Sequence, residues 1–255
     1  MKPQNLFSVE ENFFLISSDN LESVNTRMYG YCISDGQIIT DAADLNGGGY
    51  NLTPDGTYVY IQRTKDKILI RQDFVGCYGL YLFREGDYWA LSNSFIYLLD
   101  HVKKSHTITF NRQYADHFLV AGLSAQSYSE TLINEISCLD RSAVIEIDLK
   151  DRTLKTRLIN YMENSIDLDS VEGMQLLDSW FFKWTNLIRN LKSSTNNITM
   201  QLSGGHETRM VLGLFLGSGI DLNEINVFSN TDGLHVHAED FRIATKIADF
   251  YGFKR

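Results

Sequence analysis

A short segment in the last quarter of the chain carries the residue types that bind phosphate groups: Ser203, Gly204, Gly205, Glu207 and Thr208. Two adjacent glycines let the backbone turn tightly and bring its N–H groups close to an anion. The helix expected directly after them would direct its first N–H groups and its positive dipole end to the same place. The two hydroxyls add donors, and the carboxylate can hold Mg²⁺, which prefers oxygen ligands. This pattern predicts a pyrophosphate-binding loop.

The same residues also fit a purely structural role. A Ser-Gly-Gly sequence after a strand often forms a tight turn that caps the next helix, and glycine-rich turns are common in proteins. The Walker A pattern, GxxxxGK[ST], does not occur in the sequence. From spacing alone, phosphate binding and a capping turn therefore both remain open.

Helices and strands are expected to alternate around this loop. Apolar residues recur with helical spacing at 174–191, at 206–216, where Gly217 would end the helix, and at 239–251. Short strands are expected at 198–202 and 224–228. An alternation of this kind is typical of a parallel sheet.

The first half of the chain is typical of a β-sheet domain, with aromatic and β-branched runs separated by turn residues. Asn111 is expected to cap the second of two helices, which Gly122 would end. The acidic stretch 163–172 predicts a boundary that divides the chain into domains at 1–162 and 163–255. Strands are expected at 27–33, 38–40, 57–62, 67–71, 78–83, 88–91, 143–148 and 153–157, and helices at 94–102 and 111–121.

The composition is that of a globular protein and excludes several function classes. Of the 255 residues, 44% are hydrophobic and 22% are charged, which excludes a disordered chain or a collagen-like repeat. The net charge of −9 argues against broad binding to nucleic acid or to an anionic membrane. Neither a signal-peptide core nor an apolar run of about 18 residues occurs, so we expect a cytoplasmic protein. The widely spaced Cys32, Cys77 and Cys138 are each expected to be small buried apolar residues.

The segment Leu202–Arg209, LSGGHETR, resembles the L-S-G-G-x-D-S-R loop of asparagine synthetase-type ATP pyrophosphatases. Weaker resemblances to this family occur in the same order along the chain. Ile68–Phe83 is similar to the family stretch "l-RDpfGikPLYY", and Trp89–Leu99 is similar to "faSeikaLl". Thr131–Asp148 resembles the stretch around a "gI-xLpPG" turn, with Asp-Arg in place of Pro-Gly, and Glu239–Gly252 resembles a helix "E-x-x-yA-x-x-vA-x-x-lG".

The resemblance implies a fold and an activity. The fold would be an α+β, Ntn-hydrolase-like glutaminase domain, followed by the start of an α/β parallel-sheet domain of the PP-loop, adenine nucleotide alpha-hydrolase-like type. The activity would be that of an ATP-dependent carbon–nitrogen ligase. A substrate carboxylate attacks the α-phosphorus of ATP and releases pyrophosphate, and ammonia or an amine then attacks the acyl-adenylate to form an amide.

The resemblance also implies residue roles and ligands. Pyrophosphate would be held by Ser203, Gly204, Gly205 and Thr208, and Glu207 would lie near Mg²⁺. The adenosine of ATP would be flanked by Leu202, Phe228 and Ser229. The expected ligands are therefore ATP, Mg²⁺ and a small carboxylate.

The sequence departs from the family pattern in three ways. The family nucleophile is a cysteine exposed after removal of Met1, but Lys2 follows here, so glutaminase activity is not expected. Glu207 replaces the family aspartate, and its extra methylene moves the carboxylate by about 1.5 Å. The sequence also stops soon after the second helix of the ATP domain. We therefore expect part of a longer protein, or a chain completed by a partner or a second copy of itself.

These departures leave three hypotheses open. The first is an amide-forming synthetase that uses free ammonia or an amine. The second is a non-catalytic or truncated nucleotide-binding or assembly module of the same family. The third and weaker one is a glutaminase with a relocated nucleophile, for which Cys32 is the nearest candidate.

Several other residues have chemical alternatives. His206 could touch phosphate, but an exposed histidine is the simpler interpretation. His235 and His237, with Glu239 and Asp240, have a passing resemblance to the spacing of metal ligands, although no third His or Cys lies nearby in the sequence. The simpler interpretation is a polar loop that approaches ATP. Trp180 and Trp184 are expected in the core of their helix rather than as a stacking platform.

Overall fold

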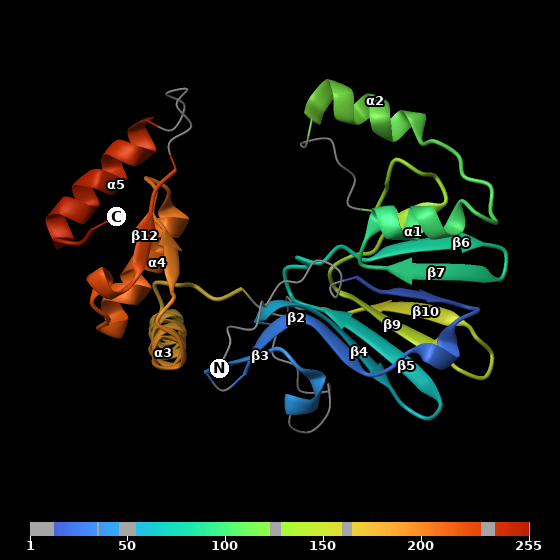
Figure 1. Ribbon diagram of the computed structural model, residues 1–255, viewed down its shortest axis with the longest axis horizontal. Coiled ribbons are helices and arrows are strands. Elements are labelled where there is room, and N and C mark those ends of the chain that lie inside the picture. Colours follow the sequence, from blue (N-terminus) through green and yellow to red (C-terminus); the bar gives the residue numbers. More distant parts are fainter. Residues whose placement is uncertain are drawn as a thin grey trace. The chain divides into compact units, whose positions relative to one another are not determined.

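The computed structural model describes residues 13–34, 36–45, 55–122, 129–159, 165–230 and 238–254. It shows a mixed α+β protein with two compact units (Figure 1). One unit comprises Met1–Ser34 and Ile38–Glu163, and the other comprises Asp35–Gln37 and Asn164–Arg255. The boundary expected after residue 162 lies beside this division.

Two sheets form the first unit. Its strands are β1 (Leu15–Ser17), β2 (Arg27–Ser34), β3 (Gln37–Ile39), β4 (Gly56–Arg63), β5 (Lys67–Gln72), β6 (Tyr81–Glu85), β7 (Tyr88–Ser92), β8 (Ile136–Cys138), β9 (Ala143–Asp148) and β10 (Leu154–Leu158). One sheet has the order β1-β7-β6-β8 and the other β10-β9-β5-β4-β2-β3. Every pair with a described register is antiparallel. The strands expected from sequence are therefore largely confirmed.

The main core of this unit contains side chains from both sheets. In β4, Val59 and Ile61 belong to this core, whereas Tyr58 and Tyr60 belong to a separate cluster. Successive side chains of a strand point to opposite faces, so this alternation places one face of β4 in the core.

Two helices follow β7 in the first unit: α1 (Phe95–Val102) and α2 (Arg112–Ala121). Leu98 and Val102 of α1 pack with the four-stranded sheet in a third cluster (Figure 1). The side chain of Asn111 caps α2 by accepting from the Tyr114 N–H, and Gly122 ends it, as the sequence predicts.

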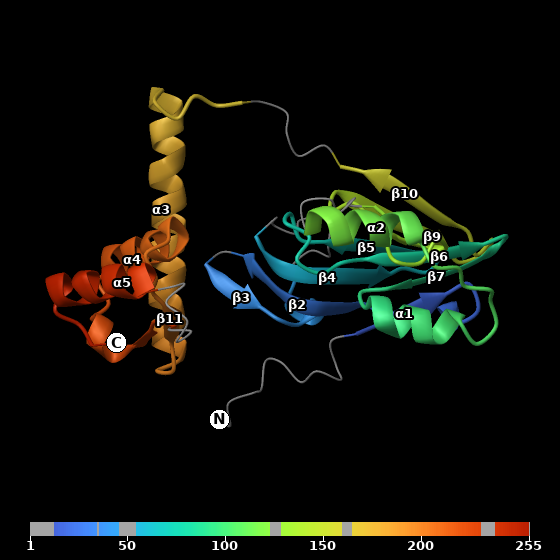
Figure 2. The same ribbon diagram turned by 90° about the horizontal axis from the view of Figure 1, so that it is seen from above.

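Helices and strands alternate in the second unit. In chain order they are α3 (Val171–Ser194), β11 (Thr199–Gln201), α4 (His206–Ser218), β12 (Asn226–Phe228) and α5 (Ala238–Tyr251). β11 and β12 are parallel, and their buried side chains share one core with α3, α4 and α5. Figure 2 shows the long helix α3 beside α4. Within the described ranges, no helix has the length and apolar character required to cross a membrane.

Several expected boundaries are wrong. β6 begins at Tyr81 rather than at residue 78, because the preceding backbone folds into a turn around Asp73. β12 begins at Asn226 rather than at 224, because a 3₁₀ turn at Leu222–Glu224 precedes it. β1 and β8 were not expected from the sequence, because strands of three residues show little periodicity.

The end of α4 also differs from the expectation. The helix continues through Gly217, where an added Cβ would lie 2.2 Å from the Phe181 ring of α3. It ends at Gly219, which adopts the left-handed conformation with φ +74°. Gly217 therefore allows close helix packing, and Gly219 ends the helix.

We expect Gly219→Ala to lower the free energy of unfolding of the second unit by about 1 kcal/mol, because alanine disfavours positive φ. Gly213→Ala, within the same helix, should instead raise it by up to about 1 kcal/mol. A Cβ meets nothing within 4 Å at either position, so backbone conformation is the relevant difference. Urea denaturation measures both values, and equal effects of the two variants would contradict this assignment.

Two expected core positions are exposed. Cys32 is buried as expected, but Cys77 is exposed in the turn before β6, and Cys138 is partly buried. Trp184 packs against the core of the second unit, but Trp180 is 37% exposed. In α3 this core cluster begins only at Trp184, so the apolar pattern of the helix extends beyond the part that the core covers.

Candidate functional site

The candidate site is the Ser-Gly-Gly loop (residues 202–205), which lies between β11 and α4. Leu202 is fully buried, and its N–H donates to the Phe228 carbonyl over 2.9 Å at the end of β12. The Ser229 hydroxyl donates to the Leu202 carbonyl over 2.7 Å. These contacts hold the carboxyl ends of the two parallel strands together, which is where open α/β sheets bind their ligands.

Hydroxyl groups hold the loop in shape. The Ser203 N–H donates to Thr208 Oγ1 over 3.1 Å, and the two hydroxyl oxygens lie 3.0 Å apart. The Gly205 N–H donates to Ser203 Oγ over 3.1 Å. The Thr208 hydroxyl also lies 3.3 Å from the Ser203 and Gly205 carbonyl oxygens, to which it can donate. The loop and the first turn of α4 therefore form one hydrogen-bonded unit.

The start of α4 differs from those of the other α-helices with a described N-cap. A side chain caps α1, α2 and α3, through Ser94, Asn111 and Ser170. At α4 the N-cap is Gly205, which provides no side-chain hydrogen bond. The first backbone N–H groups of α4 therefore have no side-chain acceptor from the cap, and an anion at this position would satisfy them.

Both glycines of the loop lie close to carboxylates. A Cβ at Gly204 would lie 2.5 Å from Oδ1 and 3.1 Å from Cα of Asp240, in the first turn of α5. A Cβ at Gly205 would lie 3.1 Å from Glu207 Oε2 and 3.2 Å from Ser203 Oγ. The loop can therefore approach α5 closely only because Gly204 has no side chain.

Arg209 contacts the backbone of the same turn. The Arg209 Nε donates to the Gly205 carbonyl over 3.3 Å, and its guanidinium lies 3.1 Å from His206 Nδ1. His206 is exposed, as expected, although it is the first residue of α4 rather than part of the loop. Both carboxylates and a guanidinium group therefore lie near the loop.

The residues present suit a magnesium ion carried by a nucleotide. The described residues include no group of three or more His, Cys, Asp or Glu side chains that could hold a metal without a ligand. A nucleotide-bound Mg²⁺ needs only one or two protein carboxylates, because phosphate and water supply the other oxygens. The carboxylates of Glu207 and Asp240 lie against the two glycines.

The structure brings together the residues that the sequence analysis singled out around the loop, with Phe228 42% exposed at its side. The sequence suggests Asp240 only as a neighbour of the histidine pair, and its position against Gly204 is seen only where α5 approaches the loop. His235 and His237 lie outside the described residues.

No protein-family model matches this chain, and no curated protein matches it either. The geometry of the loop and the residues around it are therefore the basis for a functional proposal.

Cys32, the nearest candidate of the relocated-nucleophile hypothesis, is poorly suited to that role. Cys32 has no solvent exposure, and burial raises the pKa of its thiol. Both effects oppose formation of an accessible thiolate. Cys77 is exposed, but its backbone N–H donates to the Asp73 carboxylate within a structural turn. Burial raises the pKa of Cys138.

Proposed function

We propose that the second unit binds Mg-ATP through the Ser-Gly-Gly loop and that the chain is an asparagine synthetase-like, amide-forming ligase without its own glutaminase site. The uncapped start of α4 carries this proposal, because a helix N-terminus that lacks a side-chain cap beside a double-glycine turn suits a phosphate group. The hydroxyls of Ser203 and Thr208 would bind the same anion.

In this proposal, the first unit is an Ntn-like domain and the second is the start of a PP-loop domain. The antiparallel double-sheet core and the parallel strand pair are consistent with these assignments. Two residues of the stretch that resembles the family also have clear roles: Asp73 accepts backbone hydrogen bonds in a turn, and Gly76 has φ +72°.

The reaction would need little covalent chemistry from the protein. The carboxylate oxygen of the substrate attacks the α-phosphorus, and the bond to the leaving pyrophosphate breaks. The N–H groups of α4 and the hydroxyls of Ser203 and Thr208 would stabilise the charge that develops on this pyrophosphate. An amine nitrogen then attacks the acyl carbon, AMP leaves, and the amine loses its proton.

Glu207 makes the binding of ATP dependent on a cation. Its carboxylate lies close to the phosphate position and would repel ATP alone. Mg²⁺ held by Glu207, with Asp240 as a second candidate, would remove this repulsion and add charge stabilisation at the phosphate oxygens. ATP should therefore bind more tightly with Mg²⁺ than with EDTA.

We expect saturating Mg-ATP to raise the melting temperature of the native protein, and Glu207→Gln to remove most of the difference between Mg-ATP and ATP with EDTA. Glutamine keeps the size of the side chain but cannot bind a cation as a carboxylate does. Glu172→Gln, at an exposed position in the first turn of α3, is the matched control and should retain the wild-type difference. A melting temperature that Mg-ATP leaves unchanged would contradict the proposal.

The second hypothesis, a non-catalytic nucleotide-binding module, is favoured by Glu207 itself, because its carboxylate is displaced relative to the shorter family aspartate. A measurement of pyrophosphate release distinguishes the ligase from the non-catalytic module. Stabilisation by Mg-ATP with amine-dependent pyrophosphate release supports the ligase, whereas stabilisation without release on any carboxylate tested supports the module.

A further inference from the structure

A cavity of about 480 Å³ lies at one end of the double-sheet core in the first unit. This volume lies within the range of about 300–1,000 Å³ that is typical of small-molecule sites. The end of β1, the β6–β7 turn and the β9–β10 turn meet here. We call it the sandwich-end cavity. None of the residues that line it belongs to the Ser-Gly-Gly loop or to the rest of the proposed ATP site.

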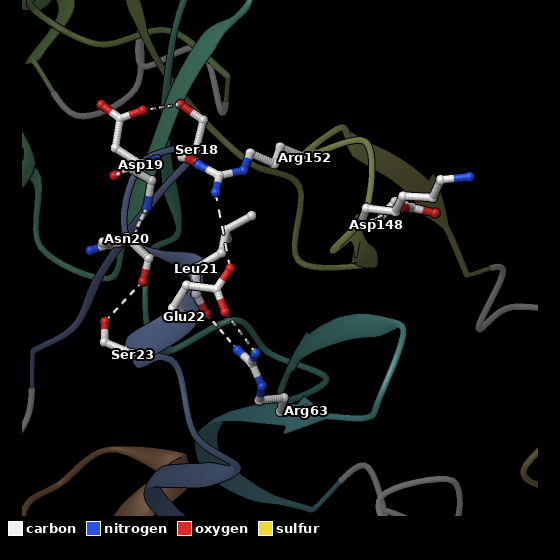
Figure 3. Close-up of polar contacts among 11 residues, drawn as sticks. Ser18, Asp19, Asn20, Leu21, Glu22, Ser23, Arg63, Asp148 and Arg152 are labelled. Carbon is white, nitrogen blue, oxygen red and sulfur yellow. Dashed lines mark hydrogen bonds and ion pairs between the residues drawn. The ribbon is translucent and has the colours of Figure 1, made fainter.

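Three hydrogen bonds fix the walls of this cavity. The buried Trp89 indole N–H donates to the Arg152 carbonyl over 2.8 Å, and the Arg152 guanidinium donates to the Ser18 carbonyl over 3.0 Å (Figure 3). The Arg84 guanidinium donates to the Leu154 carbonyl over 3.3 Å. Both guanidinium groups are therefore held in place before any ligand binds, which lowers the entropy cost of binding.

The backbone at Arg152 is strained. It has φ +55°, and no other described residue except glycine has positive φ. The turn around it is held by the Asp148 carboxylate, which accepts from the N–H groups of Lys150 and Asp151 over 2.8 and 3.0 Å. Strain of this kind persists only where the surroundings hold it, and it is concentrated at functional sites.

The charges in the cavity do not neutralise one another. Both signs are present on its lining, from Arg84, Arg152, Asp19, Asp87 and Asp151. The acid that pairs with Arg152 is Glu22, at 4.0 Å, which also pairs with Arg63 at 3.8 Å. Among the described residues, no ion pair joins either cavity arginine to any of the three cavity aspartates, and the Asp87 and Asp151 carboxylates have no hydrogen-bond partner.

This arrangement selects the charge type of the ligand. A simple anion would be attracted by the two arginines but repelled by the three carboxylates. A simple cation would be attracted by the carboxylates but repelled by the arginines. A molecule that carries a carboxylate and an ammonium group would satisfy both sets. We propose that the sandwich-end cavity binds a free α-amino acid, with its carboxylate on Arg84 and Arg152 and its ammonium group on the aspartates. The hydrocarbon part of the ligand would contact Trp89 and Leu154.

The test uses the indole N–H signals of the native protein in an NMR titration. The chain has three tryptophans, of which Trp89 lines the cavity, while Trp180 and Trp184 of α3 serve as internal references. The probe is L-alanine. Propionate lacks its ammonium group, and ethylamine lacks its carboxylate. We expect L-alanine to shift the Trp89 signal saturably and the other two compounds to bind at least about tenfold more weakly.

Two variants then assign the charges. Arg152→Gly tolerates the positive φ and removes one guanidinium, and Asp151→Asn removes one carboxylate without changing its size. Each should raise the Kd for L-alanine by about tenfold. Arg157→Gln on β10, an exposed position outside the cavity lining, is the control and should leave the Kd unchanged. If Arg152→Gly loses the dispersed spectrum of the folded protein, Arg84→Gln replaces it, and Asp87→Asn replaces Asp151→Asn in the same way.

An unshifted Trp89 signal with L-alanine overturns the proposal, as does equal binding of propionate or ethylamine. If only the arginine variant raised the Kd, the cavity would recognise a carboxylate alone. If only the aspartate variants raised the Kd, the cavity would recognise an ammonium group alone. Either result would overturn the assignment to an amino acid. None of these outcomes depends on ATP binding by the second unit.

Discussion

Asp73→Ala should lower the free energy of unfolding of the first unit by about 3 kcal/mol or more, because it leaves several backbone N–H groups without their acceptor. Asp73 has no solvent exposure. Its Oδ1 accepts from the N–H groups of Val75 and Gly76 over 3.0 and 2.8 Å, and its Oδ2 accepts from those of Tyr58 and Cys77 over 3.2 Å each. One carboxylate therefore holds the turn before β6 and attaches it to β4.

Asp73→Asn is the sharper form of this experiment. Asparagine has nearly the same shape, but its amide group would direct donors toward N–H groups that need an acceptor. It should therefore also destabilise the first unit, by about 1–3 kcal/mol. The Trp89 indole signal, followed through a urea titration, reports on this unit alone.

The matched control for Asp73 is Asp66→Asn. Asp66 is exposed in the β4–β5 turn, and this change should alter stability by no more than about 0.5 kcal/mol. If Asp73→Asn had as small an effect as Asp66→Asn, the turn would not depend on the carboxylate.

Gly204→Val should abolish the stabilisation of the second unit by Mg-ATP. A side chain at this position would overlap Asp240 and Ile243 of α5, so either the loop or α5 must move. Movement of the loop removes the hydroxyls and N–H groups from the phosphate position. We expect a rise in Kd of about a hundredfold, equivalent to ~2.7 kcal/mol of lost ligand stabilisation.

Gly213→Ala provides the control for Gly204→Val. It changes a glycine in the same unit, at a position of α4 where an added Cβ meets nothing within 4 Å. It should leave the Kd for Mg-ATP unchanged. Calorimetric titration of both variants measures the effect, and wild-type affinity in Gly204→Val would show that the loop does not bind the nucleotide.

The sequence by itself predicted those elements whose pattern is local. Aromatic and β-branched runs identified β2, β4, β5, β7 and β9, and helical spacing identified α3, α4 and α5. These predictions succeed because burial of one face imposes a period of two on a strand and of about 3.6 on a helix. The Ser-Gly-Gly loop was found in the same way, because its residue types and their order are contiguous in the chain.

Local patterns failed where a distant partner determines the structure. The sequence does not show whether Gly217 or Gly219 ends α4. In the structure, Phe181 of α3 packs against Gly217, and positive φ occurs at Gly219. Trp180 belongs to an apolar helical pattern, yet the core of its unit does not extend to it. Neither difference can be read from the residues on either side.

Tertiary structure alone decided which side chains meet at the two sites. Asp240 reaches Gly204 because α5 packs beside the loop, and Trp89 meets Arg152 because two turns far apart in sequence lie together. The physical reason is the range of the interactions. Backbone conformation and periodic burial depend on neighbours in the chain, whereas a site depends on contacts between segments, and these exist only after the chain has folded.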